Sequence, residues 1–461
     1  MIRRAFRLSA LALAGLLLLA AARIVAGKLA GPYVLARAER EFALHVGPLE
    51  IEAWVPAPLP AEENGALALW QATAAIRPWP GERPPTLPRL LAEGAAPDRK
   101  LLAEAGEWVA RNREAITALR RLVDFPGAEF PGWRTLEVVR VWLETGRDPR
   151  RFFLPHHLLL MDAGLALRAS DWNRALEDLA AMRAITVMLR QEPILILHSL
   201  SGTFEEQTLA VAHATLRAGG QVVAPGVAAE LAALAAAPDL RHGLAGETLL
   251  ARNGIRQLVE ERRPSAHRHG GWPDLFEPST ADHYVAGSLA ATTRVVRGMP
   301  IPAPRWPAHW TNPPELWPQL VALLWPLAPA PATTVPVQVI GFQMVEAEQY
   351  VLSSRRLGLI ATRLTSRSSE APPLADLPGG EAPLLWSDEP PRIERRADGG
   401  WTVSAPAGIR KVWVSYREEG SIPRSRFESR ERLLYWEVPA SPPPSEVPPS
   451  EVPGELPGPA P

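Results

Sequence analysis

The fold is decided by the stretch Leu158–Leu189, which reads LLLMDAGLALRASDWNRALEDLAAMRAITVML. Its apolar residues recur every three or four positions, which is the period of one face of an α-helix. The stretch divides into two runs, and the first is Leu158–Arg168. We expect the second run to begin at Ser170 and to end before Pro193. Two helices joined by so short a turn pack as antiparallel neighbours. The sequence therefore predicts a helical hairpin here.

This hairpin loosely resembles a tetratricopeptide unit, in Ala163-Gly164 and in Ala175-Leu176. Tetratricopeptide arrays repeat their pattern about every 34 residues, and the sequence contains no clean second copy. We therefore predict a mainly α fold, an irregular antiparallel helical array. Its second hairpin helix is expected to bury one face, formed by Leu176, Leu179, Met182, Ile185 and Leu189.

The same periodicity predicts further helices on both sides of the hairpin. They cover Leu29–His45, a run capped by Asn64 that reaches Ile76, a run capped by Asp98 that reaches Leu122, Leu136–Glu144, Thr203–Arg217, Val227–Ala236 and Leu240–Glu261. A short extended piece is expected over Leu49–Val55, and a proline-rich linker through Pro88. Together these segments form the predicted helical body, residues 32–263.

The C-terminal half changes character. Residues 264–336 are rich in Pro and Trp and predict a connecting region, with helical patches at Val285–Val296 and Leu316–Leu324. A module over 337–440 follows, with a helix at Ala347–Leu364 and a small antiparallel sheet. Its strands are expected at Arg392–Arg396, Trp401–Ser404, Val412–Tyr416 and Leu433–Val438, with a hairpin turn at Asp398-Gly399-Gly400. The proline-rich residues 441–461 predict a disordered tail.

Composition excludes several classes of function. The chain has 461 residues, 47% of them hydrophobic, so it can bury a sizeable core. Its net charge is -1, whereas a nucleic-acid-binding protein usually carries an excess of basic residues. Cysteine is absent, and this excludes disulfides, thiolate zinc sites and cysteine nucleophiles.

The N-terminal residues 1–31 predict export. Leu8–Ala22 is an apolar run that includes Leu17, Leu18 and Leu19, and it follows the basic residues Arg3, Arg4 and Arg7. Basic residues stay on the cytoplasmic side of a membrane, which places the body outside the cytoplasm. A cleaved signal peptide fits the small residues after the run. An anchor that continues to about Gly31 fits better, because Arg23 makes a poor cleavage context.

We therefore expect a single-pass protein of the bacterial inner membrane with its body in the periplasm. Its first partner is the lipid bilayer, contacted through the N-terminal segment. A protein partner is also expected, whereas nucleic acid is not. Lys28, Arg37 and Arg40 lie on the far side of the apolar run and weaken the orientation signal.

Several motifs together resemble a group of uncharacterised, single-pass bacterial envelope proteins. They are Glu63-Asn64-Gly65-Ala66-Leu67, the segment Trp108–Ala115 with Asn112, the segment Arg174–Leu179, and Gly246-Glu247. The C-terminal pattern Leu374–Gly380, Pro383-Leu384-Leu385 and Asp398–Trp401 resembles a degenerate pseudopilin module, without that module's acidic metal ligands. The resemblance implies an architecture and a location, and it brings no activity, cofactor or calcium site.

The densest polar constellation is His267, His269, Asp274 and His283. Two histidines separated by one residue in a loop can both reach a metal ion, and an aspartate or a third histidine can complete the site. Their spacing fixes no third ligand, so a solvated loop is the main interpretation and a metal site the alternative. His156-His157 diverge on a helix, and Glu206 and His213 lie two turns apart, so neither pair favours a metal.

The sequence contains no hydrolase or nucleotide-binding signature. Trp306, Trp310, Trp317 and Trp325 predict a plug between helices and sheet, with contact to a membrane surface or to sugars as alternatives. We predict no catalytic residue and no cofactor. The predicted function is a non-catalytic scaffold of the envelope. The alternatives are an accessory component of a secretion or pilus-like system, and a metal-dependent hydrolase or carbohydrate-active protein.

Overall fold

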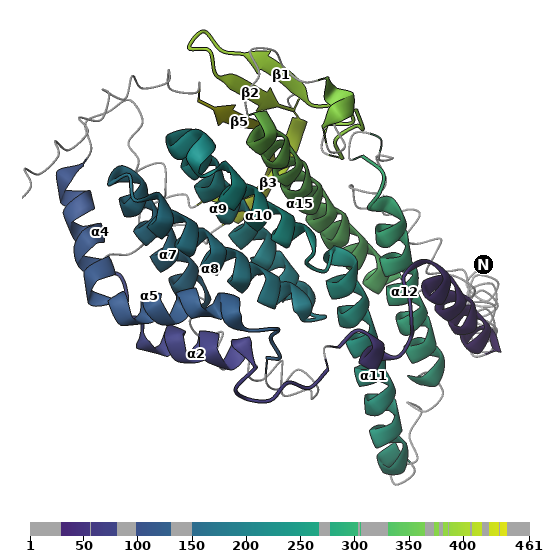
Figure 1. The fold of residues 1–461 in the computed structure, drawn as a ribbon. Helices are drawn as coiled ribbons and strands as arrows, with labels where there is room; N and C mark the ends of the chain where they lie inside the picture. Colours follow the sequence, from purple (N-terminus) through teal and green to yellow (C-terminus); the bar gives the residue numbers. More distant parts are fainter. Residues whose placement is uncertain are drawn as a thin grey trace, which may run out of the picture.

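A computed structural model gives the fold of the protein. It describes residues 29–55, 57–80, 98–130, 150–266, 277–302, 305, 331–364, 373–377, 381–385, 387–405, 408–416, 424–432 and 434–439. The predicted fold class is confirmed: the chain is mainly helical, with a small antiparallel sheet near its C-terminal end (Figure 1). The predicted helices Leu136–Glu144 and Leu316–Leu324, the linker beyond Pro80, the four tryptophans and the tail 441–461 lie outside the described residues.

The predicted hairpin is formed by α7 (Arg150–Arg168) and α8 (Trp172–Gln191). Helix α7 begins at Arg150 and not at Leu158, so that Pro155 lies inside it. Ser170 lies in the turn with a φ of 56°, and the amide of Asp171 donates to Ala166 O at 2.9 Å. This is the bonding of a helix C-terminus that closes on a left-handed residue. Asp171, and not Ser170, caps α8 by accepting from the amide of Arg174.

The remaining long helices pack on this hairpin or on one another (Figure 1). They are α9 (Leu195–Gly219), α10 (Ala224–Ala235), α11 (Leu240–Ala266), α12 (Glu277–Gly298) and α15 (Pro331–Leu364). Helix α15 packs on α9, α10 and α12, and so joins segments that are far apart in the sequence. It begins at Pro331 and not at Ala347, because the apolar stretch after Pro336 continues the helix.

Shorter helices make up the N-terminal side of the body. A helix covers 29–45, and α2 (Gly65–Ala75) follows. The piece expected to be extended over Leu49–Val55 contains the 3-10 turn η1 (Ile51–Ala53) instead. The helix expected to run from Asp98 to Leu122 is interrupted at Asn112 and forms α4 (Arg99–Arg111), α5 (Arg113–Arg120) and the 3-10 turn η2 (Arg121–Asp124).

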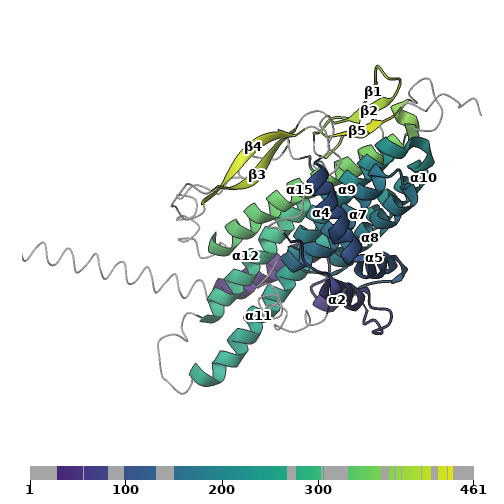
Figure 2. The same cartoon turned by 90° about the vertical axis from the view of Figure 1, so that its left-hand side faces the viewer.

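The C-terminal strands form two separate sheets. The first has the order β1-β2-β5, all antiparallel, from β1 (Arg392–Arg395), β2 (Trp401–Ser404) and β5 (Tyr435–Val438). The expected turn at Asp398–Gly400 joins its first two strands, with Gly399 at a φ of 84°. Strand β3 (Gly408–Tyr416) does not join this sheet, because it pairs with β4 (Arg424–Arg432), a strand that our sequence analysis missed (Figure 2). The run RSRFESRER of β4 lacks the apolar alternation by which strands are predicted.

The helices and the β1-β2-β5 sheet share one hydrophobic core that extends from Val34 to Val438. Gly358 on α15 lies against the indole of Trp436 on β5, where an added Cβ atom would come within 2.6 Å of the ring. The glycine therefore allows the sheet to approach α15 closely. The boundary that the sequence suggested between 336 and 337 falls inside α15.

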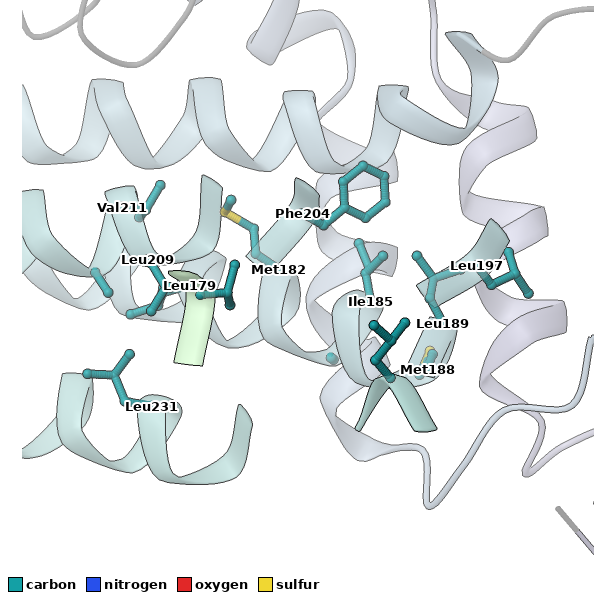
Figure 3. Close-up of a cluster of buried hydrophobic side chains, with 14 of the residues drawn as sticks. Leu179, Met182, Ile185, Met188, Leu189, Leu197, Phe204, Leu209, Val211 and Leu231 are labelled. Atoms are coloured by element: carbon teal, nitrogen blue, oxygen red, sulfur yellow. The ribbon is translucent and has the colours of Figure 1, made fainter. Parts of the chain in front are cut away.

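Helix α8 is the centre of this core. Figure 3 shows its side chains between those of α9 and α10; they are Leu179, Met182, Ile185, Met188 and Leu189 from α8, Leu197, Phe204, Leu209 and Val211 from α9, and Leu231 from α10. Of the five residues predicted to form its buried face, Leu179, Met182, Ile185 and Leu189 are buried, whereas Leu176 is partly buried. Arg190 and Asp178 of α8 are buried too, which the apolar pattern does not predict.

We expect Ile185→Ala to lower the free energy of unfolding by about 2–5 kcal/mol, because the substitution opens a cavity in a packed core. The matched control is Ile196→Ala, which removes the same atoms from a side chain that is 53% exposed. That control should cost less than about 1 kcal/mol. Chemical denaturation of both variants checks the prediction, and equal losses would contradict the central position of α8.

Candidate functional site

The structure leaves the predicted metal site untested. His267, His269 and Asp274 lie outside the described residues, and His283 lies on α12. Within the described ranges no three His, Asp or Glu side chains converge as a metal site would require. The anchor residues Leu8, Leu17, Leu18 and Leu19 also lie outside the described part, and no helix inside it is long and apolar enough to cross a membrane. Both interpretations stay predictions.

Asn64, from the first sequence motif, connects two loops. Its side chain caps α2 by accepting from the amide of Ala66 at 3.0 Å. The same oxygen accepts from the amide of Glu129 at 2.9 Å, and its nitrogen donates to Glu129 O at 2.7 Å. The amide of Gly65 donates to Gly127 O beside it. This asparagine therefore fixes the start of α2 to the loop that follows η2.

Asn112 and Trp108, from the second motif, hold the end of the α2 segment. Asn112 accepts from the amide of Arg77 at 2.7 Å, and the Trp108 indole donates to Arg77 O at 2.7 Å. The Asn112 nitrogen also donates to Trp108 O at 2.9 Å, across the break between α4 and α5. Both residues are buried. A side-chain amide thus replaces the backbone pairing that the interrupted helix loses.

The third motif supplies one side of an ion network around Arg120 on α5. The guanidinium contacts Asp178 Oδ1 at 2.8 Å, Glu177 Oε2 at 2.7 Å and Asp162 Oδ2 at 2.9 Å. Arg174 also pairs with Asp162. Burial and the nearby charge of Asp162 raise the pKa of Asp178 well above its ordinary value, against the attraction of Arg120. The network ties α5 to both helices of the hairpin.

A second cluster of buried charges lies where α8, α9 and α15 meet. Arg190 is 2% exposed and holds Glu348 through two parallel hydrogen bonds of 2.8 Å. Its Nη2 also lies 2.8 Å from Glu205 Oε2, and Glu205 Oε1 lies 3.2 Å from Arg355 Nη1. Arg355 donates to Leu234 O at 2.7 Å as well. Two guanidinium groups therefore balance two carboxylates in a closed cluster, which we call the Arg190 cluster.

The charges of the Arg190 cluster depend on one another. Burial acts to lower the pKa of Arg190, but the carboxylates of Glu348 and Glu205 outweigh it and raise that pKa. Burial raises the pKa of Glu205, and both arginines oppose the shift. A guanidinium keeps its proton in proteins, so Arg190 is the fixed charge and the carboxylates are held by it. Chemically, the arrangement suits helix positioning, because each charge faces a charge of the chain itself.

Among the described residues, His156, His198 and His213 each contact another part of the chain, and they do not join a metal-binding group. His156 lies within hydrogen-bond distance of Gln207 Oε1 at 2.8 Å and Thr208 Oγ1 at 3.2 Å, with its ring stacked on Phe204. His198 donates from Nε2 to Glu192 O at 3.1 Å. His213 accepts from the amide of Glu437 and so connects α9 to β5. Each histidine joins two parts of the chain.

The helix over 29–45 is fastened to α11. Glu39 Oε1 lies 2.7 Å from Arg252 Nη2 and 2.9 Å from Arg256 Nη2. Arg252 also donates to Leu49 O at 3.3 Å, just beyond the helix. Phe42 on the same helix is completely buried. The first described helix is thus a fixed part of the body.

Sequence reasoning missed Arg190, Glu348 and Arg355 altogether. The one local signal of a buried charge is an arginine within an otherwise apolar helix face. Arg190 is such an arginine, at the end of the α8 run. Its partner is 158 positions away, so no local pattern points to it.

Comparisons with protein-family models, with curated proteins and with solved structures find no match for this chain.

The Arg190 cluster predicts a specific mutational pattern. We expect Arg190→Met to cost about 3–5 kcal/mol of unfolding free energy, because it leaves two buried carboxylates facing a single arginine. Combining it with Glu348→Leu leaves the Glu205–Arg355 pair balanced, so the double variant should be more stable than the single one. Arg241→Met, at a half-exposed ion pair, is the control and should cost less than about 1 kcal/mol. A double variant weaker than the single one would contradict the balance of charges.

The buried histidines predict a loss of stability in acid. Burial lowers the pKa of His156 and that of His198 to about 3, from 6.5 in an exposed site. The unfolded chain binds these protons and the folded chain does not, so stability is present above about pH 6.5 and falls as the pH drops toward 3. From pH 7 to pH 5 the loss is about 2 kcal/mol for each histidine.

His156→Gln should remove one histidine's share of that loss, because glutamine does not titrate. The measurement is denaturant unfolding of the full chain in mild detergent at pH 7, 6 and 5, for the parent protein and for the variant. The variant should lose about 2 kcal/mol less than the parent between pH 7 and pH 5. The same pH dependence in both proteins would show that His156 is not held neutral.

Proposed function

We propose that this protein is a bilayer-anchored envelope scaffold, with a rigid helical body that holds a protein partner at a fixed position outside the cytoplasm. The observation that carries the proposal is the attachment of the helix over 29–45 to α11 through Glu39, Arg252 and Arg256. This helix begins seven residues after the end of the apolar run Leu8–Ala22 in the sequence. A body fastened to the segment next to an anchor keeps one orientation toward the membrane.

The use of the polar motifs also supports a scaffold. The sequence motifs that resemble envelope proteins include Asn64, Trp108, Asn112 and Asp178. In the structure these side chains contact other parts of the same chain. Gly246 has a similar role, since an added Cβ atom would come within 2.0 Å of Pro193 O. Residues with such contacts determine the relative positions of helices, which is what a scaffold requires.

Purification of the crosslinked full chain from washed bacterial membranes tests the proposal, with a metal analysis on the same sample. We expect the chain to stay with the membranes and to bring down one protein in stoichiometric amount. Arg190→Met should weaken that capture by loosening the body, and the addition of Glu348→Leu should restore part of it. Leu17→Arg with Leu18→Arg should release the chain from the membranes, because two charges in an apolar span are costly.

Two results would contradict the proposal. One is a parent chain that washes off the membranes as readily as the Leu17→Arg, Leu18→Arg variant. The other is a chain without a protein partner that carries one transition metal ion, lost on His267→Ala with His269→Ala. That second result would favour the metal-dependent alternative.

A further inference from the structure

One face of the helix over 29–45 combines exposed apolar and basic side chains. Leu29, Tyr33 and Leu44 are 77%, 68% and 73% exposed, and Arg37 and Arg40 are exposed as well. Successive residues of an α-helix are rotated by about 100°, which places these five side chains within an arc of about 80°. We call this face the exposed stripe.

The exposed stripe is unusual within the described part of the chain. Among the described residues, three of the four most exposed large hydrophobic side chains lie on this one helix. The other is Val222 on η3 (Gly220–Val222). Scattered apolar residues on a surface need no explanation, but a contiguous group points to an interaction. The stripe therefore needs an occupant.

The opposite face of the helix fixes the direction in which the stripe points. Val34, Leu35, Ala38 and Phe42 are buried against the body, and Glu39 pairs with the arginines of α11. The helix therefore cannot roll to hide its apolar residues. The stripe faces away from the body along the whole helix, over roughly 22 Å at 1.5 Å per residue.

The charges of the stripe fit an anionic partner. On this helix Glu39 is paired with α11, and Glu41 lies 3.4 Å from His45. Among the residues that the structure describes, neither Arg37 nor Arg40 is ion-paired to a carboxylate, so both guanidinium groups are open to an outside anion. Guanidinium groups pair well with phosphate, and tyrosine is enriched where apolar and aqueous phases meet.

The position of the stripe in the sequence identifies the occupant. The apolar run Leu8–Ala22, continued by Ile24, Val25 and Ala26, ends three residues before Leu29. A helix that starts so close to an anchor begins at the surface of the bilayer. Leucine and tyrosine on one side with arginine among them are the features of a helix that lies in a lipid interface.

We infer that the exposed stripe lies flat on the lipid surface, with Leu29, Tyr33 and Leu44 between the headgroups and with Arg37 and Arg40 on anionic phosphates. This inference rests on the proposed anchor and adds a second contact to it. It also gives Arg37 and Arg40 a role. Basic residues usually flank a membrane span on its cytoplasmic side, whereas these two lie on the opposite side in the proposed orientation. A body attached at two points is oriented, whereas one attached through a single span is free to tilt.

The absence of cysteine from the sequence makes a direct test possible, since one introduced thiol labels one site. Tyr33→Cys carries an environment-sensitive fluorophore in the stripe. Val222→Cys is the matched control, because Val222 is 79% exposed, Tyr33 is 68% exposed, and Val222 lies outside the stripe. The full chain is reconstituted into vesicles of phosphatidylcholine with about one third phosphatidylglycerol, a composition chosen to mimic an anionic leaflet. Some of these lipids carry a quencher near the headgroup.

We expect the lipid quencher to lower the fluorescence at position 33 at least about twofold, and to leave position 222 almost unchanged. Arg37→Gln with Arg40→Gln should reduce quenching at position 33 in the anionic vesicles. The same variant should change little in vesicles of phosphatidylcholine alone, because the arginines act on charge. Arg113→Gln with Arg241→Gln removes two exposed charges elsewhere and should have no effect.

The outcomes separate this inference from the proposed function. A chain that floats with the vesicles but shows equal quenching at positions 33 and 222 would overturn the inference and leave the anchor standing. A chain that does not float would overturn both. In native membranes, a photocrosslinker at position 33 that attaches to a protein and not to lipid would show that a partner or a second copy covers the stripe, and would also overturn the inference.

Discussion

A guanidinium buried at the end of α8 must be matched by carboxylates, because an unpaired charge in a protein interior costs several kcal/mol. Arg190 meets this requirement with Glu348 from α15 and Glu205 from α9. The two parallel hydrogen bonds to Glu348 define a direction as well as a distance. Helix α15 is therefore held in one register on α8, and Gly358 farther along α15 then comes to lie beneath Trp436 of β5. The position of the sheet follows from that of the helix.

Much of the local structure was predictable from the sequence, because its causes are local. Asn64 caps α2 and Asp98 caps α4, as the residue types at these positions indicate. The turn at Asp398–Gly400 needs a residue with positive φ, and Gly399 provides it. Four of the five residues predicted for the apolar face of α8 are buried, since a 3.6-residue period can be read in the sequence.

The parts that were not predicted depend on distant partners. Arg190 and Glu348 are 158 positions apart, and each looks like an ordinary polar residue within its own helix. Six of the nine residues of strand β4 are charged and one is apolar, so its pairing with β3 has no signal in the alternation of side chains. The break at Asn112 arises because its side chain holds the backbone of Arg77, 35 positions earlier. The residues of the candidate metal site gave a local signal, and it stays a prediction.

The division of polar groups between inside and outside has a consequence for function. Within the described part of the chain, the best-connected charges of Arg120, Arg190 and Arg252 face carboxylates of the same chain. These pairs fix the positions of helices and are already satisfied when a partner arrives. The exposed stripe has the opposite character, since its arginines and apolar side chains face outward from a helix that cannot turn. We therefore propose that the chain is held at this amphipathic face, so that the rest of its surface is presented in a constant orientation.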